Sequence, residues 1–356
     1  MNSKSRASTA RCMPCRFAAI GAAVFAFAGT FAYAAGWLTP SRLTTYRIIN
    51  QFQANNGPHP GYRRNHAKGL CVEGYFDSNG NAASISRAQV FTQGRTPVIG
   101  RFAIPGGNPS APDASVPVRS FALLFTQRDG EQWRTAMNST PVFAVHTPEQ
   151  FYQQLVAAQP DSKTGKPDPA KLKAFYASHP ETQPFQQWVK THPAPSGLGN
   201  AAYYSINAFR FTDANGQEHA VRWSVEPEAP YAPVNPQEKN DPDFLSQQFD
   251  EQLKHGNVRW HLIVTVANAG DPSNDATLQW PADRQRIDAG TVVIERSAPQ
   301  ANGVCRDVNF DPTVLPDGIA PSDDPLLAAR SAAYAVSYQR RTREEALHHA
   351  SATSQP

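Results

Sequence analysis

The stretch FDPTVLPDGIAPSDDPLLAARSAAYAVSYQRR, residues 310–341, joins a proline-rich approach to a long helical run. In the run, Arg330, Tyr334 and Arg341 are separated by four and then seven residues. At about 100° per residue, these offsets place all three on one helix face. A fixed cation next to a tyrosine favours the phenolate, and phenolate is an axial ligand in some haem enzymes. The spacing alone is more typical of an amphipathic helix with a half-buried tyrosine and arginines that reach solvent.

The composition indicates a folded body with little net charge. The 356 residues, 40% hydrophobic and 18% charged, suffice for one large domain or two ordinary ones. The formal charge is +3, but residues 1–34 contain Lys4, Arg6, Arg11 and Arg16 and no acidic residue, so the remainder carries −1. A nearly neutral body gives no electrostatic basis for binding nucleic acid, and we expect no such partner.

The N-terminal segment has the pattern of an export signal. Four basic residues precede the uncharged run FAAIGAAVFAFAGTFAYAAGWL, residues 17–38. A signal peptide has a basic start, an apolar middle and a small-residue cleavage site, which residues 32–34 (AYA) would supply. The run is also long enough to span a bilayer. We therefore predict that residues 1–38 are a signal peptide or an N-terminal membrane anchor. The body would be exported to the periplasm, either soluble or attached to the inner membrane through residues 17–38.

Strand candidates dominate the middle of the chain, while helical patterns lie at the ends and in insertions. Strands are expected at 71–76, 87–93, 97–104, 118–125, 141–147, 258–268 and 291–296, with a hairpin over 203–227 that turns at 213–216. Helices are expected at 39–53, 148–158, 171–178, 182–191, from 241 to Gly256, and from about 323 to 349. The pattern lacks the strand–helix alternation of a doubly wound sheet. It predicts an α+β fold with an antiparallel sheet that could close into a barrel.

Several stretches together resemble the haem-containing catalases. They are RRNHAKGLCVEGYF (63–76), MNSTPVFAVHTPEQF (137–151), AYYSINAFRFTDANGQEHAVRW (202–223) and the opening stretch (310–341). The likeness covers about residues 48–345. The chain is much shorter than a typical catalase and has no room for its C-terminal additions. It therefore looks most like the short catalase-related peroxidases, which are often exported.

The resemblance implies a catalase-like antiparallel β-barrel with surrounding helices and a C-terminal helix that carries the ligand of haem b. The haem domain would span residues 39–345, and residues 346–356 would form a disordered tail. Tyr334 falls at the position of the axial iron ligand, and Arg330 is the cation beside it. His66, followed by the AKG of the family, matches the distal histidine, and Asn138 matches the distal asparagine.

The other expected cofactor contacts are arginines that meet the haem propionates and aromatic rings that line the haem pocket. The arginines are Arg63, Arg101 and Arg341, and the rings are Phe143 and Phe151. Considered alone, His66 would more often be a structural histidine, and Asn138 a turn residue.

Three positions depart from the family pattern. Ala103, in RFAI, stands where catalases have a serine that supports the distal histidine. Ser139 replaces the second asparagine of the distal pair, and Val336 replaces an aspartate two residues after the proximal tyrosine. The first change is expected to remove a hydrogen bond that orients His66. These changes cast more doubt on efficient disproportionation of peroxide than on haem binding.

The resemblance predicts a haem-dependent peroxidase that reduces hydrogen peroxide or organic peroxides with a small organic electron donor, with room for weak catalase activity. Two alternatives stay open: a catalase-like hydroperoxide isomerase of the allene oxide synthase type, and a non-enzymatic exported haem-binding protein. Cys71 and Cys305 either pair in a disulfide, which an exported location permits, or remain buried free thiols.

Overall fold

The computed structural model describes residues 13–34, 37–38 and 42–353, and the chain divides into two compact units, residues 1–47 and 48–356. The first unit contains α1 (Met13–Ala34). Among the described residues, α1 is the one helix long and apolar enough to cross a membrane, with a mean hydropathy of 1.8 and no buried residue. A signal sequence has the same properties. The predicted basic residues Lys4, Arg6 and Arg11 lie outside the described residues.

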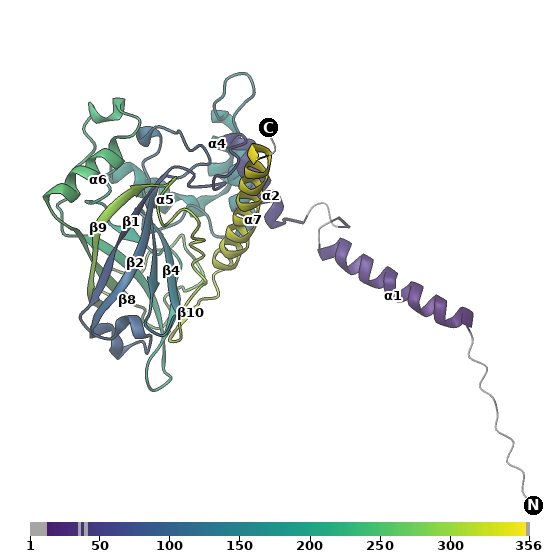
Figure 1. The fold of residues 1–356 in the computed structure, drawn as a ribbon, viewed down its shortest axis with the longest axis horizontal. Coiled ribbons are helices and arrows are strands. Elements are labelled where there is room, and N and C mark those ends of the chain that lie inside the picture. Colours follow the sequence, from purple (N-terminus) through teal and green to yellow (C-terminus); the bar gives the residue numbers. More distant parts are fainter. Residues whose placement is uncertain (1–12, 35–36, 39–41, 354–356) are drawn as a thin grey trace, which may run out of the picture. The chain divides into compact units, whose positions relative to one another are not determined.

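The second unit is built on a closed antiparallel barrel (Figure 1). Eight strands follow one another in the order β7-β5-β4-β3-β2-β1-β9-β8, and the β7–β8 pairing closes the ring. Their bounds are β1 (Gly69–Ser78), β2 (Gly94–Ala103), β3 (Ser120–Thr126), β4 (Gln132–Asn138), β5 (Tyr203–Tyr204), β7 (Glu218–Pro227), β8 (Val258–Val266) and β9 (Arg286–Pro299). Two further strands, β6 (Phe209–Thr212) and β10 (Ile319–Pro321), extend the sheet beyond β7. The predicted α+β class and antiparallel barrel are confirmed.

Side chains of β2, β3 and β4 point alternately into the packed interior of the barrel and outward from its wall. Phe102, Phe121 and Met137, on β2, β3 and β4, belong to the buried core inside the barrel. The rings of Phe102 and Phe121 stack with their centroids 4.1 Å apart. Because successive strand residues point to opposite faces, the neighbours of these core residues face outward. The outer face of β2, β3 and β4 therefore carries residues 101 and 103, 120 and 122, and 136 and 138.

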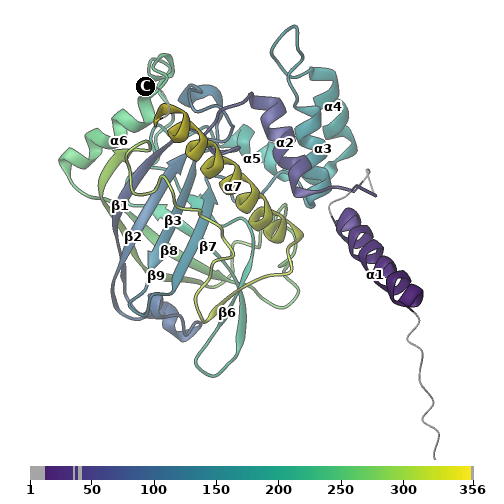
Figure 2. The same ribbon diagram turned by 45° about the vertical axis from the view of Figure 1, so that its right-hand side comes forward.

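Helices cover the outside of the barrel, and α7 runs across its outer surface (Figure 2). The helices are α2 (Thr45–Asn56), α3 (Pro148–Ala157), α4 (Pro169–Ser178), α5 (Gln183–Thr191), α6 (Phe244–His255) and α7 (Pro325–Thr353). A capping box starts α3, since Thr147 and Gln150 each accept a hydrogen bond at the helix N-terminus. The C-terminal helix is described as far as Thr353, past residue 346 where a tail was expected.

Two strand predictions are wrong for the same reason. Residues 87–93 contain a short 3-10 helix, Gln89–Phe91, and residues 141–147 form no strand. Both segments are apolar because they are buried in irregular conformations: Val90 and Phe91 fill the barrel core, and Phe143 lines a cavity. Conversely, β4 was not predicted, because its outward positions are polar or small and its apolar content is low.

Candidate active site

One cavity, lined both by the outer face of the barrel and by α7, contains the predicted site residues. The barrel side is made mainly of small residues, Ala103, Ser120, Ala122 and Ala136, which leave space in front of the sheet. Larger apolar side chains complete the walls: Ile48, Ile49, Phe52, Phe143, Phe151, Phe310 and Leu326. All nine site residues predicted from the sequence line this cavity: Arg63, His66, Arg101, Asn138, Phe143, Phe151, Arg330, Tyr334 and Arg341.

His66 lies in a tight turn just before β1. Its backbone is left-handed, with φ of 56°, which is uncommon for a residue other than glycine. The side chain of Asn65 fixes this turn, because its Oδ1 accepts hydrogen bonds from the backbone N–H groups of His66 (3.0 Å) and Gly106 (2.8 Å). A sparsely populated backbone conformation held in place by its surroundings is typical of functional sites.

The imidazole of His66 belongs to a three-residue hydrogen-bond network. Its Nδ1 lies 3.2 Å from Ser120 Oγ, and Ser120 Oγ donates to Asn138 Oδ1 at 2.7 Å. The expectation that Ala103 leaves His66 without a supporting hydroxyl is therefore wrong, because Ser120 supplies it from the neighbouring strand. Burial, together with the positive charges of Arg101, Arg330 and Arg63, lowers the pKa of His66 to about 3. The ring is thus neutral near pH 7.

The α7 side of the cavity is fixed to the barrel through Arg330. Its guanidinium donates to the backbone carbonyl of Ala136 on β4 (2.8 Å) and to Asn207 Oδ1. Asn207 in turn donates to the buried carboxylate of Asp324 at 2.7 Å. Tyr334, one turn along α7, packs against the cluster formed by Cys71, Leu124, Cys305 and Phe310. This arrangement sets both the position and the rotation of α7 relative to the sheet.

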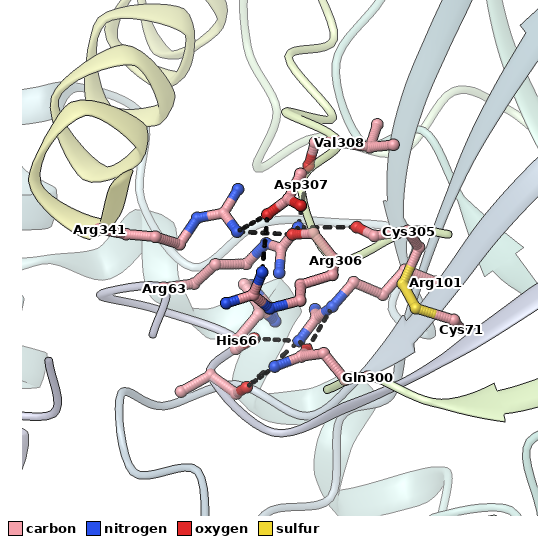
Figure 3. The surroundings of a disulfide bond; sticks show 11 residues. Arg63, His66, Cys71, Arg101, Gln300, Cys305, Arg306, Asp307, Val308 and Arg341 are labelled. Carbon is pink, nitrogen blue, oxygen red and sulfur yellow. Dashed lines mark hydrogen bonds and ion pairs between the residues drawn. A yellow bond between two sulfur atoms is a disulfide. The ribbon is translucent and has the colours of Figure 1, made fainter. Parts of the chain in front are cut away.

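Three arginines converge on one region of the cavity: Arg101 and Arg341 are buried and Arg63 is half-buried (Figure 3). Burial is the main cause that lowers the pKa of each, to about 9 for Arg63. Mutual repulsion adds to this effect, since Arg341 acts on Arg63 and Arg63 acts on Arg101. A cluster of cations that repel one another in a desolvated place favours an anionic ligand.

Backbone carbonyls hold these arginines in place. Arg63 donates to the carbonyls of Cys305, Arg306 and Val308 at 2.8–3.2 Å, and Arg341 donates to that of Arg306 at 2.5 Å. Arg101 donates to the carbonyl of His66 at 2.7 Å. The carbonyls of segment 305–308 therefore hold the guanidinium groups of Arg63 and Arg341 in place.

A disulfide joins Cys71 to Cys305 and thereby links segment 305–308 to the barrel (Figure 3). Cys71, on β1, is paired directly with Arg101 on β2. Gly303 packs so closely on the bridge that a Cβ there would lie 2.5 Å from Cys71 Sγ. Likewise a side chain at Gly69 would clash with the Arg101 guanidinium. Cys71 and Cys305 therefore pair in a disulfide and are not buried free thiols, the other possibility that the sequence left open.

Aromatic rings cover the remaining wall. Phe143 and Phe151 lie with ring centroids 5.5 Å apart, and Phe151 is 5.8 Å from Phe52 of α2. Residues that sequence reasoning missed are the polar supports, Asn65, Ser120, Asn207 and Gln300, of which Gln300 accepts from Arg101 Nε at 2.8 Å. Ser120, Asn207 and Gln300 contact predicted residues that are distant in sequence, and neither Ser120 nor Gln300 belongs to a quoted motif. Asn65 directly precedes His66, and Asn207 lies in the hairpin stretch.

Comparisons with known proteins agree with this arrangement. The family model described as Catalase matches residues 32–349. A catalase-related peroxidase of Synechococcus elongatus is 36% identical over 88% of this chain and 92% of its own length. A second catalase-related peroxidase, of Mycolicibacterium paratuberculosis, is 30% identical over 84% of this chain and 95% of its own length.

Solved structures show the same fold. A bacterial catalase superposes with a TM-score of 0.71 at 22% identity, over 82% of this chain and 59% of the catalase. The chain thus spans about three fifths of that catalase, but nearly the whole length of the two catalase-related peroxidases. The family match, the barrel and the relatives identify the chain as a member of the catalase family of oxidoreductases.

Proposed function

We propose that the chain is a haem-dependent peroxidase that reduces hydrogen peroxide or organic peroxides with electrons from a small organic donor. The observation that carries the proposal is the shared cavity: a neutral histidine and an orienting amide line it together with a tyrosine on α7 and a cluster of three arginines. The two relatives that match this chain along nearly their full lengths are both named catalase-related peroxidase, which favours a peroxidase over a true catalase.

The cavity residues fit haem b. The bed of small side chains on the barrel face and the rings of Phe143 and Phe151 suit a flat apolar ring system. The three mutually repelling arginines, Arg63, Arg101 and Arg341, suit its two carboxylates. Tyr334 offers a phenolic oxygen to iron, and Arg330, one turn away, fixes that part of α7 to the Ala136 carbonyl on β4. Bound haem would supply the iron through which electrons pass from the donor to the peroxide.

The chain's own part in the chemistry is to move a proton and to orient the peroxide. Neutral His66 can take the proton from one peroxide oxygen and return it to the other, acting first as a base and then as an acid. Asn138 uses its carbonyl oxygen to accept from Ser120, so its amide N–H groups are the ones available to hold the peroxide. Correct positioning of the reactants lowers the barrier further.

The proposal includes a location outside the cytoplasm. Its support is the apolar helix α1 with basic residues before it, followed by a body with almost no net charge. The positive end of such a segment is retained in the cytoplasm, so the body is translocated. Either cleavage after export or retention as an anchor to the inner membrane fits this proposal.

The test is a comparison of product and donor consumption. The purified full chain, loaded with haem, is mixed with hydrogen peroxide or with a fatty-acid hydroperoxide, each with and without a phenolic donor. Peroxidase activity requires donor and consumes it in proportion to peroxide. Oxygen release without donor would indicate a catalase, conversion of the fatty-acid hydroperoxide without donor would indicate an isomerase, and no turnover would indicate a haem-binding protein.

A further inference from the structure

We propose that Ser120 is the positioning residue for proton transfer in this site, acting on His66 and Asn138 together from β3, the strand paired with β2, where the resemblance places the family's supporting serine at position 103. The inference rests on the proposed peroxidase function. It deepens that function by assigning the residue that fixes which atoms in the cavity accept and donate protons.

The register of the sheet explains how Ser120 comes to serve this purpose. Four residues form one row across adjacent strands, because Gly69 pairs with Ala103, Ala103 with Ser120, and Ser120 with Asn138. Paired residues on one face of an antiparallel sheet have Cβ atoms about 4.5–5.5 Å apart. A hydroxyl at either position 103 or position 120 could therefore reach a side chain that lies between the two strands.

The direction of the Ser120 O–H group determines which ring nitrogen of His66 carries the proton. Serine has one O–H donor, and here Ser120 uses it toward Asn138 Oδ1 at 2.7 Å. Toward His66 Nδ1, at 3.2 Å, Ser120 can then only accept. Nδ1 must carry the one proton of the neutral imidazole, which leaves Nε2 as the basic nitrogen.

The same hydroxyl determines the orientation of the amide. Because Asn138 Oδ1 accepts from Ser120, the amide Nδ2 is the group that remains to donate. Both side chains line the cavity. Ser120 thus presents a proton acceptor, His66 Nε2, together with a proton donor, Asn138 Nδ2. A peroxide needs this pair: its O–H proton passes to the acceptor, and its other lone pairs receive a hydrogen bond from the donor.

The first experiment moves the hydroxyl across the strand pair. Ser120→Ala in the haem-loaded full chain should slow the haem absorbance change on mixing with hydrogen peroxide by roughly tenfold, the equivalent of one lost hydrogen bond. The double variant Ser120→Ala/Ala103→Ser should recover most of the rate, because the hydroxyl returns from the paired position. Ser78→Ala is the matched control: it removes a buried barrel serine that donates to the Phe91 carbonyl, far along the sheet.

The second experiment determines the tautomer of His66 and does not depend on catalysis. In the cofactor-free chain labelled with ¹⁵N-histidine, the ring nitrogen shifts of His66 should show Nδ1–H in the wild type and in the double variant, and a mixture of tautomers in Ser120→Ala. If the chain turned over no peroxide but showed these shifts, the proposed function would fail while the positioning role stood. Unchanged shifts in Ser120→Ala, or a wild-type rate in that variant, would overturn the positioning role.

Discussion

Ala103 on β2 and Ser120 on β3 are direct cross-strand partners, and the hydroxyl that contacts the His66 ring stands on the second of them. The same hydroxyl reaches Asn138, the partner of Ser120 on β4. The neighbouring strands β3 and β4 therefore hold two polar groups of the site, Ser120 and Asn138, side by side, and the hydrogen-bonded ladder sets their spacing. Sites supported by strands are more precise than sites supported by loops alone.

Replacement of His66 should separate cofactor binding from peroxide chemistry. His66→Ala should retain haem, because the proposed iron ligand, Tyr334, is on α7, and should lose the fast reaction with peroxide by about 10²–10⁴-fold. Asn138→Ala should lose less, because it removes an orienting hydrogen bond and leaves the proton carrier in place. Stopped-flow absorbance of each haem-loaded variant measures the rate of its reaction with peroxide. An unchanged rate in His66→Ala would show that this histidine is structural.

The pH dependence of stability should report the lowered pKa of His66. Its pKa is about 3 in the folded chain, against an ordinary value near 6.5. Between these values the unfolded chain binds a proton that the folded chain refuses, so stability is lost as the pH falls from 6.5 toward 3. The loss is at most about 1.4 kcal/mol per pH unit.

His66→Asn removes this titration and keeps a residue that tolerates the left-handed backbone. Thermal unfolding of the cofactor-free chain between pH 7.5 and 4.5 should show the variant gaining on the wild type as the pH falls. Parallel curves would mean that the imidazole titrates normally in the folded chain.

Tyr334→Phe should weaken haem binding and change the absorption spectrum, because it removes the phenolic oxygen while keeping the ring that packs on Cys305 and Phe310. Tyr338→Phe is the control, since Tyr338 lines the same cavity one turn further along α7. Haem titration of both variants, followed by their spectra, decides between the two tyrosines. A spectral change in Tyr338→Phe alone would reassign the ligand.

The arginine cluster should govern cofactor affinity. Arg63→Leu and Arg341→Leu should each weaken haem binding by about tenfold or more, because each removes a charged hydrogen-bond donor for a carboxylate. Arg95→Leu, which removes an exposed arginine paired with Asp77, should leave the affinity unchanged. The measurement is haem titration of the cofactor-free chain. Equal affinities across all three variants would exclude a propionate site at this cluster.

A reporter fused after Pro356 should be active only outside the cytoplasm. Lys4, Arg6, Arg11 and Arg16 precede the apolar run, and positive flanking charge keeps that end in the cytoplasm. Replacing the four basic residues by glutamine should lower the fraction of correctly oriented chains. Paired fusions to a phosphatase, active only after export, and to a cytoplasmic fluorescent reporter measure the outcome. Strong signal from the cytoplasmic reporter would contradict export.

The sequence predicts much of this site because each predicted residue sits in a recognisable local pattern. Arg330, Tyr334 and Arg341 share a helix face by their spacing alone, and α7 places all three on one cavity. Ser120 could not be found in this way. Its contribution depends on the register between β2 and β3, which the hydrophobic pattern of a single strand does not specify in detail. A search of the strand facing Ala103 for a compensating hydroxyl would have found it.

The errors in the fold prediction have a related origin. Residues 141–147 carry an apolar run that is typical of a strand, yet their backbone is irregular and Phe143 N–H bonds to the Ala276 carbonyl. Burial under helices, rather than sheet pairing, explains the composition. The strand β4 has the opposite character, since its outward positions face the cavity and stay small or polar. Apolar content measures burial and does not by itself distinguish a strand from a lining segment.

The bridge between Cys71 and Cys305 has a consequence for the order of events during biogenesis. It joins residues 234 positions apart, so it can form only after nearly the whole chain has been synthesised. The carbonyls that hold Arg63 and Arg341 belong to the segment that begins at Cys305. A chain in a reducing compartment lacks this cross-link. The segment that holds two arginines of the proposed cofactor site would then be locked to the barrel only in an oxidising compartment.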